Sequence, residues 1–388
     1  MLTAVLLAGV PTIVSEESGR KGLFLSKRFV GWSVTVKNRM LIMDDLLEVL
    51  DRRSLIGFLL LSPVWALLFG GCGHATDSSE KMLKCELVSY IKSYPDSSFF
   101  SQVSTMQYQD GKIYVLDEAR RDVATMNLEF SDFSLIGKPG EGPGELARPV
   151  GLYVEKDTVY ILDGGTVSVR KYVNSEFISS FSVPAANSYR FFMNKDTAFL
   201  SSVTDSTFYM KSAENWQRGD LSALVFAGDV HDFGDVKRNA SLNQRHLVRD
   251  DTSLYGIASS SSLLGKYDLL SNRQEGTFDL TSISLMKENL AYEKSQPYDP
   301  RSYYVFISDV YTMNGKLYLL CAELKDRDKG GFRVNKILSL KTEPKLQLDA
   351  IYVLPGKIYT SFCVTPDYIF ATNYSNERIE KLAFPVPD

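Results

Sequence analysis

The chain has 388 residues, a net charge of −4, and 21 Tyr and 22 Phe side chains. The small negative charge disfavours a polyanionic partner, so we do not expect nucleic acid as a ligand. The high content of Tyr and Phe favours pleated, half-buried strands and predicts an all-β fold.

The N-terminal part contains an uncharged run, residues 55–69, which follows Arg52 and Arg53. A bilayer span needs roughly 20 apolar residues, so this shorter run is interpreted as the hydrophobic part of a signal peptide. Gly70 and Gly71 stand directly before Cys72, as in the lipobox of bacterial lipoproteins, where the cysteine receives a diacylglycerol. We therefore predict lipid attachment at Cys72. The alternative is an uncleaved anchor, or a buried hydrophobic helix, with an incidental cysteine.

These features divide the chain into three parts. Residues 1–71 are predicted to be an upstream extension and a signal peptide, either removed or translated from a start codon assigned too early. Residues 72–83 are predicted to be the lipidated cysteine and a polar tether, and residues 84–388 a single folded domain. Gly73 stands where lipoproteins retained at the inner membrane carry Asp. We expect an outer-membrane lipoprotein that faces the periplasm or the cell surface.

One phrase of about seven residues recurs along the rest of the chain and is seen most clearly in "GKIYVLD" and "DTVYILD". Each copy is a short turn followed by alternating β-branched, aromatic and aliphatic residues, which predicts a turn and a buried strand. The copies occur at residues 111–117, 157–163, 196–202, 252–258, 315–321 and 366–373.

The second copy shows what one repeat contains. Four strand-like segments, "PVGLYV", "TVYILD", "SVRKYV" and "FISSFSV", follow one another through short turns. Four antiparallel strands in each repeat of about 45 residues, repeated six times, are the signature of a six-bladed β-propeller. The predicted fold is therefore an all-β six-bladed propeller of four-stranded antiparallel blades, preceded by a lipoprotein signal segment.

Three copies end in Asp117, Asp163 or Asn373. Such side chains accept hydrogen bonds from the backbone of a following turn, so we predict Asx-type turns at these strand ends. Other copies carry Ser202, Ala258 or Cys321 at the same place, which favours this structural role over a ring of catalytic acids.

Closure of the ring is predicted from a segment outside the repeats. The sequence "KMLKCELVSYIKSY" has strand-like composition, and we expect it to supply the outer strand of the last blade beside "RIEKLAF". An open propeller would otherwise leave two exposed edges.

Two long insertions interrupt the repeats, in residues 204–251 and 276–301. Loops on one rim of a propeller carry binding functions, and residues 287–291 could form a short helix. Tyr303 and Tyr304 lie near the second insertion and could form a platform for sugars or peptides, with burial in the core as the alternative.

The stretch "IGKPGEGPGELARP", residues 136–149, resembles a phosphate-binding glycine loop at first sight. It carries Glu141 and Glu145 instead of a cation and is followed by a strand, so phosphate binding is not expected. We predict a joint between two blades, in which Gly140, Gly142 and Gly144 permit positive φ. Glu141 and Glu145 remain candidate functional residues.

Metal and thiol chemistry have little support in the sequence. The histidines are scattered and the cysteine spacing does not suit zinc, so we assign no metal-binding residues and no cofactor. Residues 325–331, "KDRDKGG", resemble a fragment of a calcium loop but lack its terminal bidentate Glu, so a solvated hairpin tip is the favoured interpretation and calcium remains the alternative. Cys85, Cys321 and Cys363 are predicted to be buried thiols, with one disulfide as the alternative.

The phrases "LIGKPGEGPGEL", "VYILD" and "YIFATNYSNERIEKL" behind a lipobox resemble the TolB-like six-bladed propeller lipoproteins of Bacteroidetes, with NHL-repeat relatives. The likeness covers residues 88–384. It implies a cell-envelope propeller and supplies no catalytic residue.

Two functions follow from this resemblance and from the residues. The favoured one is a monomeric, lipid-anchored binding or scaffold module for a protein, peptide or glycan, with no catalytic residues. The alternative is a metal-dependent propeller enzyme, such as a lyase or a lactonase-like hydrolase, with its site on the central axis.

Overall fold

The computed structural model describes residues 80–184, 190–202, 208–212, 225–227, 232–297, 299, 302–325 and 331–385. The chain divides into two units, Met1–Thr76 and Asp77–Asp388, and the structure described below belongs to the second. Cys72, the signal segment and most of the segment 325–331 lie outside the described residues.

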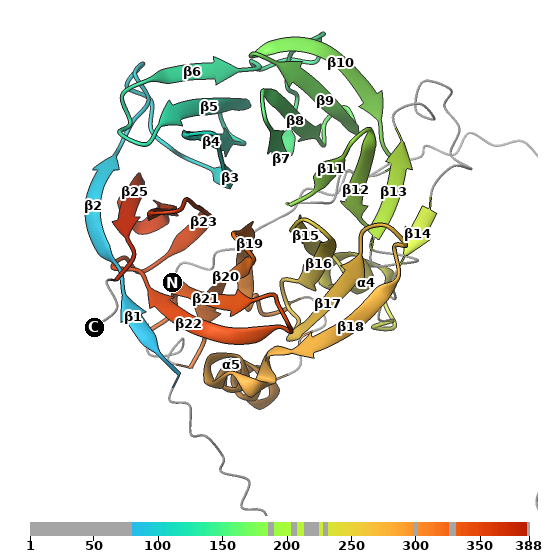
Figure 1. The fold of residues 1–388 in the computed structure, drawn as a ribbon, viewed down its shortest axis with the longest axis vertical. Coiled ribbons are helices and arrows are strands. Elements are labelled where there is room, and N and C mark those ends of the chain that lie inside the picture. The colour runs from blue at the N-terminus through green and yellow to red at the C-terminus, as the bar shows by residue number, and fades with distance from the viewer. Residues whose placement is uncertain are drawn as a thin grey trace, which may run out of the picture. The chain divides into compact units, whose positions relative to one another are not determined.

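Six sheets lie around a common axis, each with its first strand innermost, as Figure 1 shows. The predicted all-β propeller of four-stranded antiparallel blades is confirmed. Blades 1 to 3 contain β3 (Val103–Gln109), β4 (Lys112–Asp117), β5 (Asp122–Asn127) and β6 (Phe133–Ile136); β7 (Pro149–Glu155), β8 (Thr158–Asp163), β9 (Ser168–Val173) and β10 (Glu176–Ser182); and β11 (Phe192–Asn194), β12 (Thr197–Ser201), β13 (Phe208–Ser212) and β14 (Val225–Ala227).

The second half of the ring is built in the same way. Blades 4 to 6 contain β15 (Arg245–Arg249), β16 (Ser253–Ala258), β17 (Leu263–Asp268) and β18 (Gln274–Asp279); β19 (Ile307–Met313), β20 (Lys316–Glu323), β21 (Arg333–Lys341) and β22 (Gln347–Val353), joined by β1 (Met82–Lys84); and β23 (Tyr359–Val364), β24 (Tyr368–Asn373), β25 (Arg378–Ala383) and β2 (Glu86–Ile91).

Burial falls from the second strand of a blade to its outermost strand. In β8 every residue after Thr158 is buried, whereas in β10 no residue is fully buried. The difference arises because neighbouring blades cover both faces of the inner strands, while the last strand lies on the rim. This is why the recurring phrase is the most apolar part of each repeat.

The N-terminal segment closes the ring as predicted. The strand β2 pairs antiparallel with β25, from Glu86 opposite Ala383 to Ile91 opposite Ile379. The strand β1 makes a second pairing that was not predicted, because it adds parallel to β22 as a fifth strand of blade 5. We call residues 82–91 the strap. Met82 and Leu83, predicted to belong to the tether, are part of this strap.

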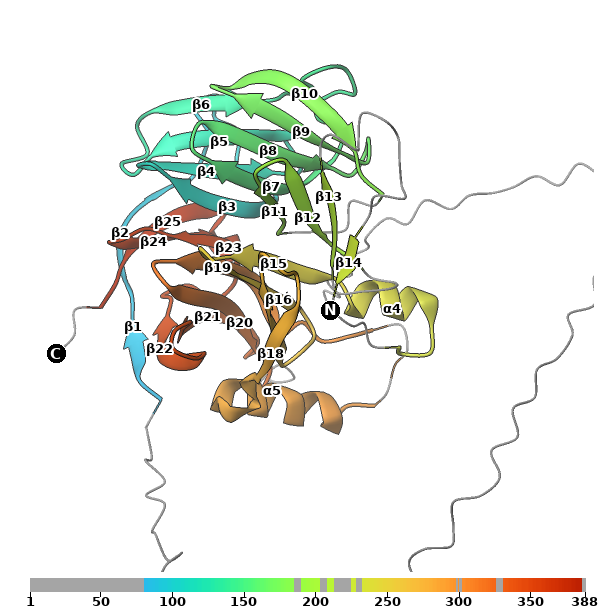
Figure 2. The same ribbon diagram turned by 45° about the vertical axis from the view of Figure 1, so that its right-hand side comes forward.

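The first predicted insertion, residues 204–251, is not a single loop, because β13, β14 and β15 lie within it; the second, residues 276–301, begins inside β18. The first contains α4 (Val236–Leu242), and the second contains η2 (Leu280–Ser282) and α5 (Ser284–Ser295); a further short turn, η4 (Tyr374–Asn376), lies in blade 6. Figure 2 shows α4 and α5 beside blades 4 and 5. The helix α5 includes the predicted residues 287–291. None of the helices in the described ranges is long and apolar enough to span a bilayer.

The glycine-rich stretch joins β6 of blade 1 to β7 of blade 2, as predicted. Gly140 and Gly144 have positive φ, of 148° and 72°, and Gly137 has a φ of 77°. Gly142 was expected to have positive φ as well, but it is not among the positive-φ residues. Its amide instead donates to the Glu145 carboxylate, which fixes the turn through a side chain.

The three cysteines of the described chain, Cys85, Cys321 and Cys363, are buried free thiols. Burial raises the pKa of each thiol above its usual range. The predicted buried thiols are therefore confirmed, and the disulfide alternative is not observed among these residues.

Candidate functional site at the ring axis

The innermost strands bring one residue from each blade to the same level of the axis. We call this set the axial ring: Thr105, Gly151, Arg190, His246, Asp309 and Ser361. Four members lie opposite equivalent residues of the second strand, as Asp309 lies opposite Leu320. Arg190 stands two residues before β11 of the third blade, and Ser361 lies in β23. All six are buried, although five of them carry polar side chains.

An irregularity in strand pairing recurs beside these residues. The register shifts between Val103 and Thr105, between Pro149 and Gly151, and between Ile307 and Asp309. A similar shift precedes Phe362 in blade 6. A β-bulge bends its strand and redirects the side chains next to it. The repeated bulge therefore distinguishes the level of the axial ring from the rest of each inner strand.

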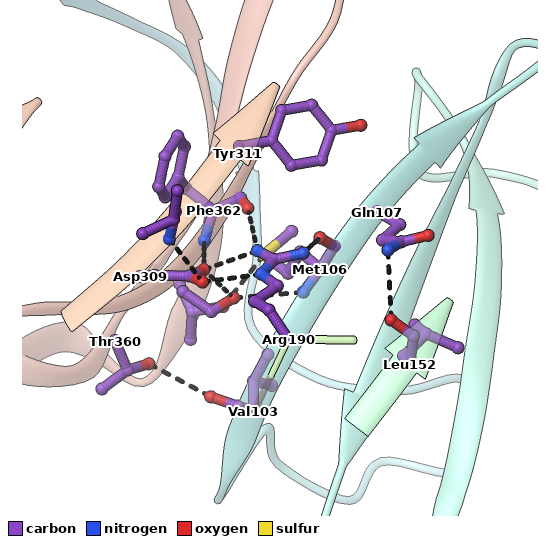
Figure 3. A network of polar contacts seen from close by, with 12 residues as sticks. Val103, Met106, Gln107, Leu152, Arg190, Asp309, Tyr311, Thr360 and Phe362 are labelled. Carbon is purple, nitrogen blue, oxygen red and sulfur yellow. Dashed lines mark hydrogen bonds and ion pairs between the residues drawn. The ribbon is translucent and has the colours of Figure 1, made fainter. Parts of the chain in front are cut away.

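Arg190 and Asp309 form a bidentate ion pair across the axis, shown in Figure 3. Arg190 Nε donates to Asp309 Oδ1 at 2.7 Å, and Nη2 donates to Oδ2 at 2.6 Å. The same guanidinium donates to the carbonyl oxygens of Met106, at 2.8 Å, and Phe362, at 2.9 Å. One side chain thus links blades 1, 3, 5 and 6.

The Asp309 carboxylate also accepts hydrogen bonds from donors in blades 5 and 6. It accepts hydrogen bonds from Ser361 Oγ at 2.7 Å, from Phe362 N at 3.1 Å and from Val310 N at 2.8 Å. Ser361 Oγ in turn accepts from Met106 N at 3.1 Å. Removing charges from water is costly, and this number of partners is what makes a buried pair tolerable.

Electrostatics favour the charged form of the Arg190 guanidinium. Burial by itself lowers the pKa of Arg190, but the charge of Asp309 and its hydrogen bonds together outweigh this effect and raise the pKa above its usual value. The Asp309 carboxylate is therefore engaged by a fixed cation and by three neutral donors. Both of its oxygens are occupied, which gives Asp309 a structural role.

His246 completes the polar part of the axial ring. Its Nε2 lies 2.9 Å from Ser259 Oγ, and burial lowers its pKa to about 4. Ser361, His246 and Asp309 have the composition of a nucleophilic triad. Their geometry is different, because Ser361 donates directly to Asp309 while His246 pairs with Ser259. A triad needs the histidine between the other two groups.

A second polar layer lies towards the face of the ring that carries the hairpins between first and second strands. We call this the hairpin face. Arg249 of blade 4 donates to Glu155 Oε1 at 2.8 Å and to Tyr153 Oη at 3.0 Å in blade 2, and its backbone oxygen accepts from Thr312 Oγ1 of blade 5. These partly exposed residues connect three blades where the axis meets solvent.

A cavity of about 480 Å³ opens beside this layer, between blades 2 and 3. Its walls are two hairpins that share the sequence Lys-Asp-Thr, at residues 156–158 and 195–197. We call it the KDT groove. Its lining consists of Glu155, Lys156, Asp157, Thr158, Tyr160, Val173, Asn194 and Lys195. The lining residues supply two carboxylates, two ammonium groups, an amide and two hydroxyls, which suits a polar ligand with more than one kind of group.

The predicted site residues lie elsewhere. Glu145 accepts from Gly142 N at 2.9 Å and pairs with Lys138 at 3.3 Å, so its carboxylate holds the joint between blades 1 and 2. These hydrogen bonds, from Gly142 first, lower the pKa of Glu145. Glu141 is exposed in the same joint. The structure therefore gives Glu145 a structural partner and leaves Glu141 facing solvent.

The two predicted tyrosines lie at another joint, between blades 4 and 5. Tyr304 packs edge-on against Tyr292 of α5, with ring centroids 5.6 Å apart, whereas Tyr303 is 45% exposed. Tyr304 thus belongs to the packing of α5, and only Tyr303 offers a ring to solvent. Neither tyrosine belongs to the axial ring or to the KDT groove.

The residues that close the repeated strands have the predicted structural role. Asp117 Oδ1 accepts from Ala119 N at 3.1 Å, and Asp163 Oδ1 accepts from Gly165 N at 3.0 Å, which confirms the Asx-type turns. Asp163 also accepts from Arg148 N at 2.8 Å. These acids therefore hold the incoming connection as well as their own turn.

The axial ring was not recognised from the sequence, although a signal for it exists. Each member stands twelve residues before the last position of its repeat, as Thr105 does before Asp117 and Asp309 before Cys321. The pattern is hidden because the residue type differs in every blade. The axial-ring positions can therefore be identified only by their fixed offset in the repeat, because the six repeats do not share a residue type there.

Comparison with known proteins supports the fold. Residues 76–216 match the family model DUF5128, described as a six-bladed β-propeller. The chain is similar to the crystal structure of a putative exported protein from Bacteroides fragilis, with 14% identity, a TM-score of 0.52, and coverage of 79% of this chain and 99% of that one. A member of the DUF4221 family from Bacteroides vulgatus is 10% identical, with a TM-score of 0.51 and coverage of 80% and 99%. No curated protein matches the sequence. At these identities the likeness is one of fold.

Proposed function

We propose that this protein is a lipid-anchored β-propeller of the bacterial cell envelope that binds a protein, peptide or glycan on its hairpin face. The observation that carries the binding role is the KDT groove, which exposes charged and neutral polar groups at the joint of two blades. Its volume of about 480 Å³ lies within the range of ordinary ligand sites.

In this proposal the axis does not bind the ligand but holds the blades in fixed positions. The Arg190–Asp309 pair and the hydrogen bonds around it occupy the level at which the inner strands converge. A rigid axis keeps the hairpins of neighbouring blades at fixed positions, and a preformed site loses less entropy on binding. The buried pair therefore serves the groove indirectly, by holding the blades that carry it.

The location rests on sequence features and is part of the same proposal. The uncharged run before Cys72, with two glycines at the junction, is the pattern of a lipoprotein signal. The TolB-like phrases, the match to a propeller family and the likeness to a putative exported Bacteroides protein agree with an outer-membrane lipoprotein. Such a location would bring envelope proteins and glycans within reach of the hairpin face.

The groove can be tested with peptide and glycan arrays probed with the purified full chain, followed by calorimetric titration of the ligands found. The variant Lys156→Glu/Lys195→Glu reverses two charges of the lining. We expect it to weaken binding roughly tenfold, which corresponds to about 1.4 kcal/mol. The matched control is Lys112→Glu, an exposed change on the neighbouring hairpin of blade 1.

Two results would count against the proposal. Equal weakening by the groove variant and by the control would place binding elsewhere on the ring. Stoichiometric calcium or zinc in the purified protein, together with turnover of a substrate, would favour the alternative metal-dependent enzyme.

A further inference from the structure

The strap exposes a concentration of apolar side chains on the rim. Met82, Leu87, Val88 and Tyr90 are 58%, 40%, 51% and 47% exposed. Single exposed apolar residues are common on protein surfaces, whereas these four lie within nine residues of two consecutive edge strands and form a concentrated apolar surface.

The fold itself causes this exposure. Both β1 and β2 are outermost in their sheets, so one side of each has no neighbouring strand. The register of β2 shifts between Leu87 and Ser89, which makes Val88 the extra residue of a bulge and turns it outward. Figure 1 shows the two strands following one another along the rim of blades 5 and 6.

The charges in the strap and at the residues directly flanking it are mostly positive. Lys81, Lys84 and Lys92 are exposed, against one exposed carboxylate, Glu86, in a chain whose net charge is −4. The Tyr90 ring lies 5.7 Å from Lys92 Nζ and 4.3 Å from the Arg378 guanidinium. A surface that combines aliphatic, aromatic and basic side chains is suited to the boundary between anionic headgroups and acyl chains.

The short distance along the chain from Cys72 to the strap indicates which surface the strap contacts. Met82 is only ten positions after Cys72, and an extended chain of that length spans at most about 36 Å. We infer that the strap is a membrane-facing surface, which lays the rim of blades 5 and 6 against an anionic lipid bilayer. This inference rests on the proposed lipid attachment at Cys72. It would set the orientation of the ring, with its axis inclined towards the plane of the membrane.

The experiment places a fluorophore on the strap of the full, lipidated chain. The variant Val88→Cys carries an environment-sensitive label, and the protein is anchored in phosphatidylethanolamine and phosphatidylglycerol vesicles that contain nitroxide-labelled lipid. The matched control is Ile178→Cys on β10 of blade 2, an apolar rim residue that is 55% exposed. Cys85, Cys321 and Cys363 are buried, so labelling is directed to the new thiol.

We expect quenching at position 88 to be roughly threefold stronger than at position 178, because a membrane-facing residue penetrates the headgroup region. The variant Lys81→Glu/Lys84→Glu/Lys92→Glu in the Val88→Cys background should reduce that quenching about twofold or more, since each lysine near an anionic surface contributes to attraction. Its thermal unfolding should be unchanged, because the three lysines are exposed.

Equal quenching at both positions in vesicle-bound protein would overturn the membrane-facing strap and leave lipid attachment standing. A chain that does not float with the vesicles would overturn both. Binding of a ligand in the KDT groove is measured separately and is unaffected by either result. Crosslinks between strap residues of two copies, without quenching, would assign the surface to a dimer instead.

Discussion

Arg190 and Asp309 are 119 positions apart in the chain, and their side chains meet on the ring axis with N–O distances of 2.7 and 2.6 Å. One precedes the inner strand of blade 3 and the other lies in the inner strand of blade 5. The pair can form only when the intervening blade and both of its neighbours have taken their places. It is therefore a product of ring closure.

Removing the negative partner should destabilise the ring strongly. Asp309→Asn leaves the buried Arg190 guanidinium without its counter-ion, which typically costs about 3–5 kcal/mol. Urea unfolding of Asp309→Asn and of the exposed control Asp367→Asn checks this. The double variant Arg190→Met/Asp309→Leu should recover much of the loss, because it removes both buried charges. A single variant as stable as the wild type would contradict the structural role.

The strap should contribute to stability through both of its pairings. Deleting residues 81–94 opens the edge of blade 6, removes the fifth strand of blade 5, and takes away the hydrogen bond from Tyr94 Oη to Asp117. We expect a sharply lower melting temperature in a calorimetric scan. Deleting residues 73–79 of the tether instead should leave the melting temperature unchanged. Similar melting temperatures for the two deletions would show that the ring closes without the strap.

The joint between blades 1 and 2 should depend on a glycine. Gly140 has a φ of 148°, and a Cβ there would overlap the Glu145 side chain. Gly140→Ala is expected to lower the unfolding free energy by about 1–3 kcal/mol, the usual cost of a strained backbone position. Gly276→Ala is the control, because a Cβ at Gly276 meets open space and no positive φ is required there. Chemical denaturation of both variants makes the comparison, and equal stability would count against the strain.

The free energy of unfolding should decrease as the pH is lowered, and His246 should contribute to this decrease. Its pKa is about 4 in the folded chain, lowered by burial, against roughly 6.5 in an unfolded chain. Between these values the unfolded state binds a proton that the folded state does not, so folding weakens as the pH falls from about 6.5 towards 4. At pH 5 the contribution is about 2 kcal/mol.

The neutral variant His246→Gln separates this effect from the titration of other groups. Urea unfolding at pH 7 and at pH 5 should show a smaller loss of stability for the variant than for the wild type. An identical loss in both proteins would mean that His246 does not contribute to the pH dependence.

Lipid attachment can be tested at the predicted residue. Cys72→Ala should yield an unprocessed precursor or a soluble periplasmic form, because the acyl chains that hold the mature protein to the bilayer are not added. Fractionation and mass spectrometry of the N-terminal peptide measure this. A mature-size product that still sediments with membranes would contradict lipid attachment at this residue.

Much of the architecture was predictable because its signals are local. Strand periodicity and turn residues are read within a few positions, so "GKIYVLD" and its relatives predicted the number of blades and the Asx-type turns at Asp117 and Asp163. The closing strand was predicted for a related reason, since a strand-like segment outside six regular repeats has one free edge to fill. The glycine-rich joint followed from its place between two repeats.

Tertiary structure alone decided the interactions between distant residues. The pairing of Arg190 with Asp309, the parallel addition of β1 to β22, and the meeting of two Lys-Asp-Thr hairpins at one groove all join segments that the sequence presents separately. Local patterns carry no information on such partners, because the distance between two blades is set by packing around the whole ring. The sequence thus determined the blades and their order, and ring closure determined which charges meet on the axis.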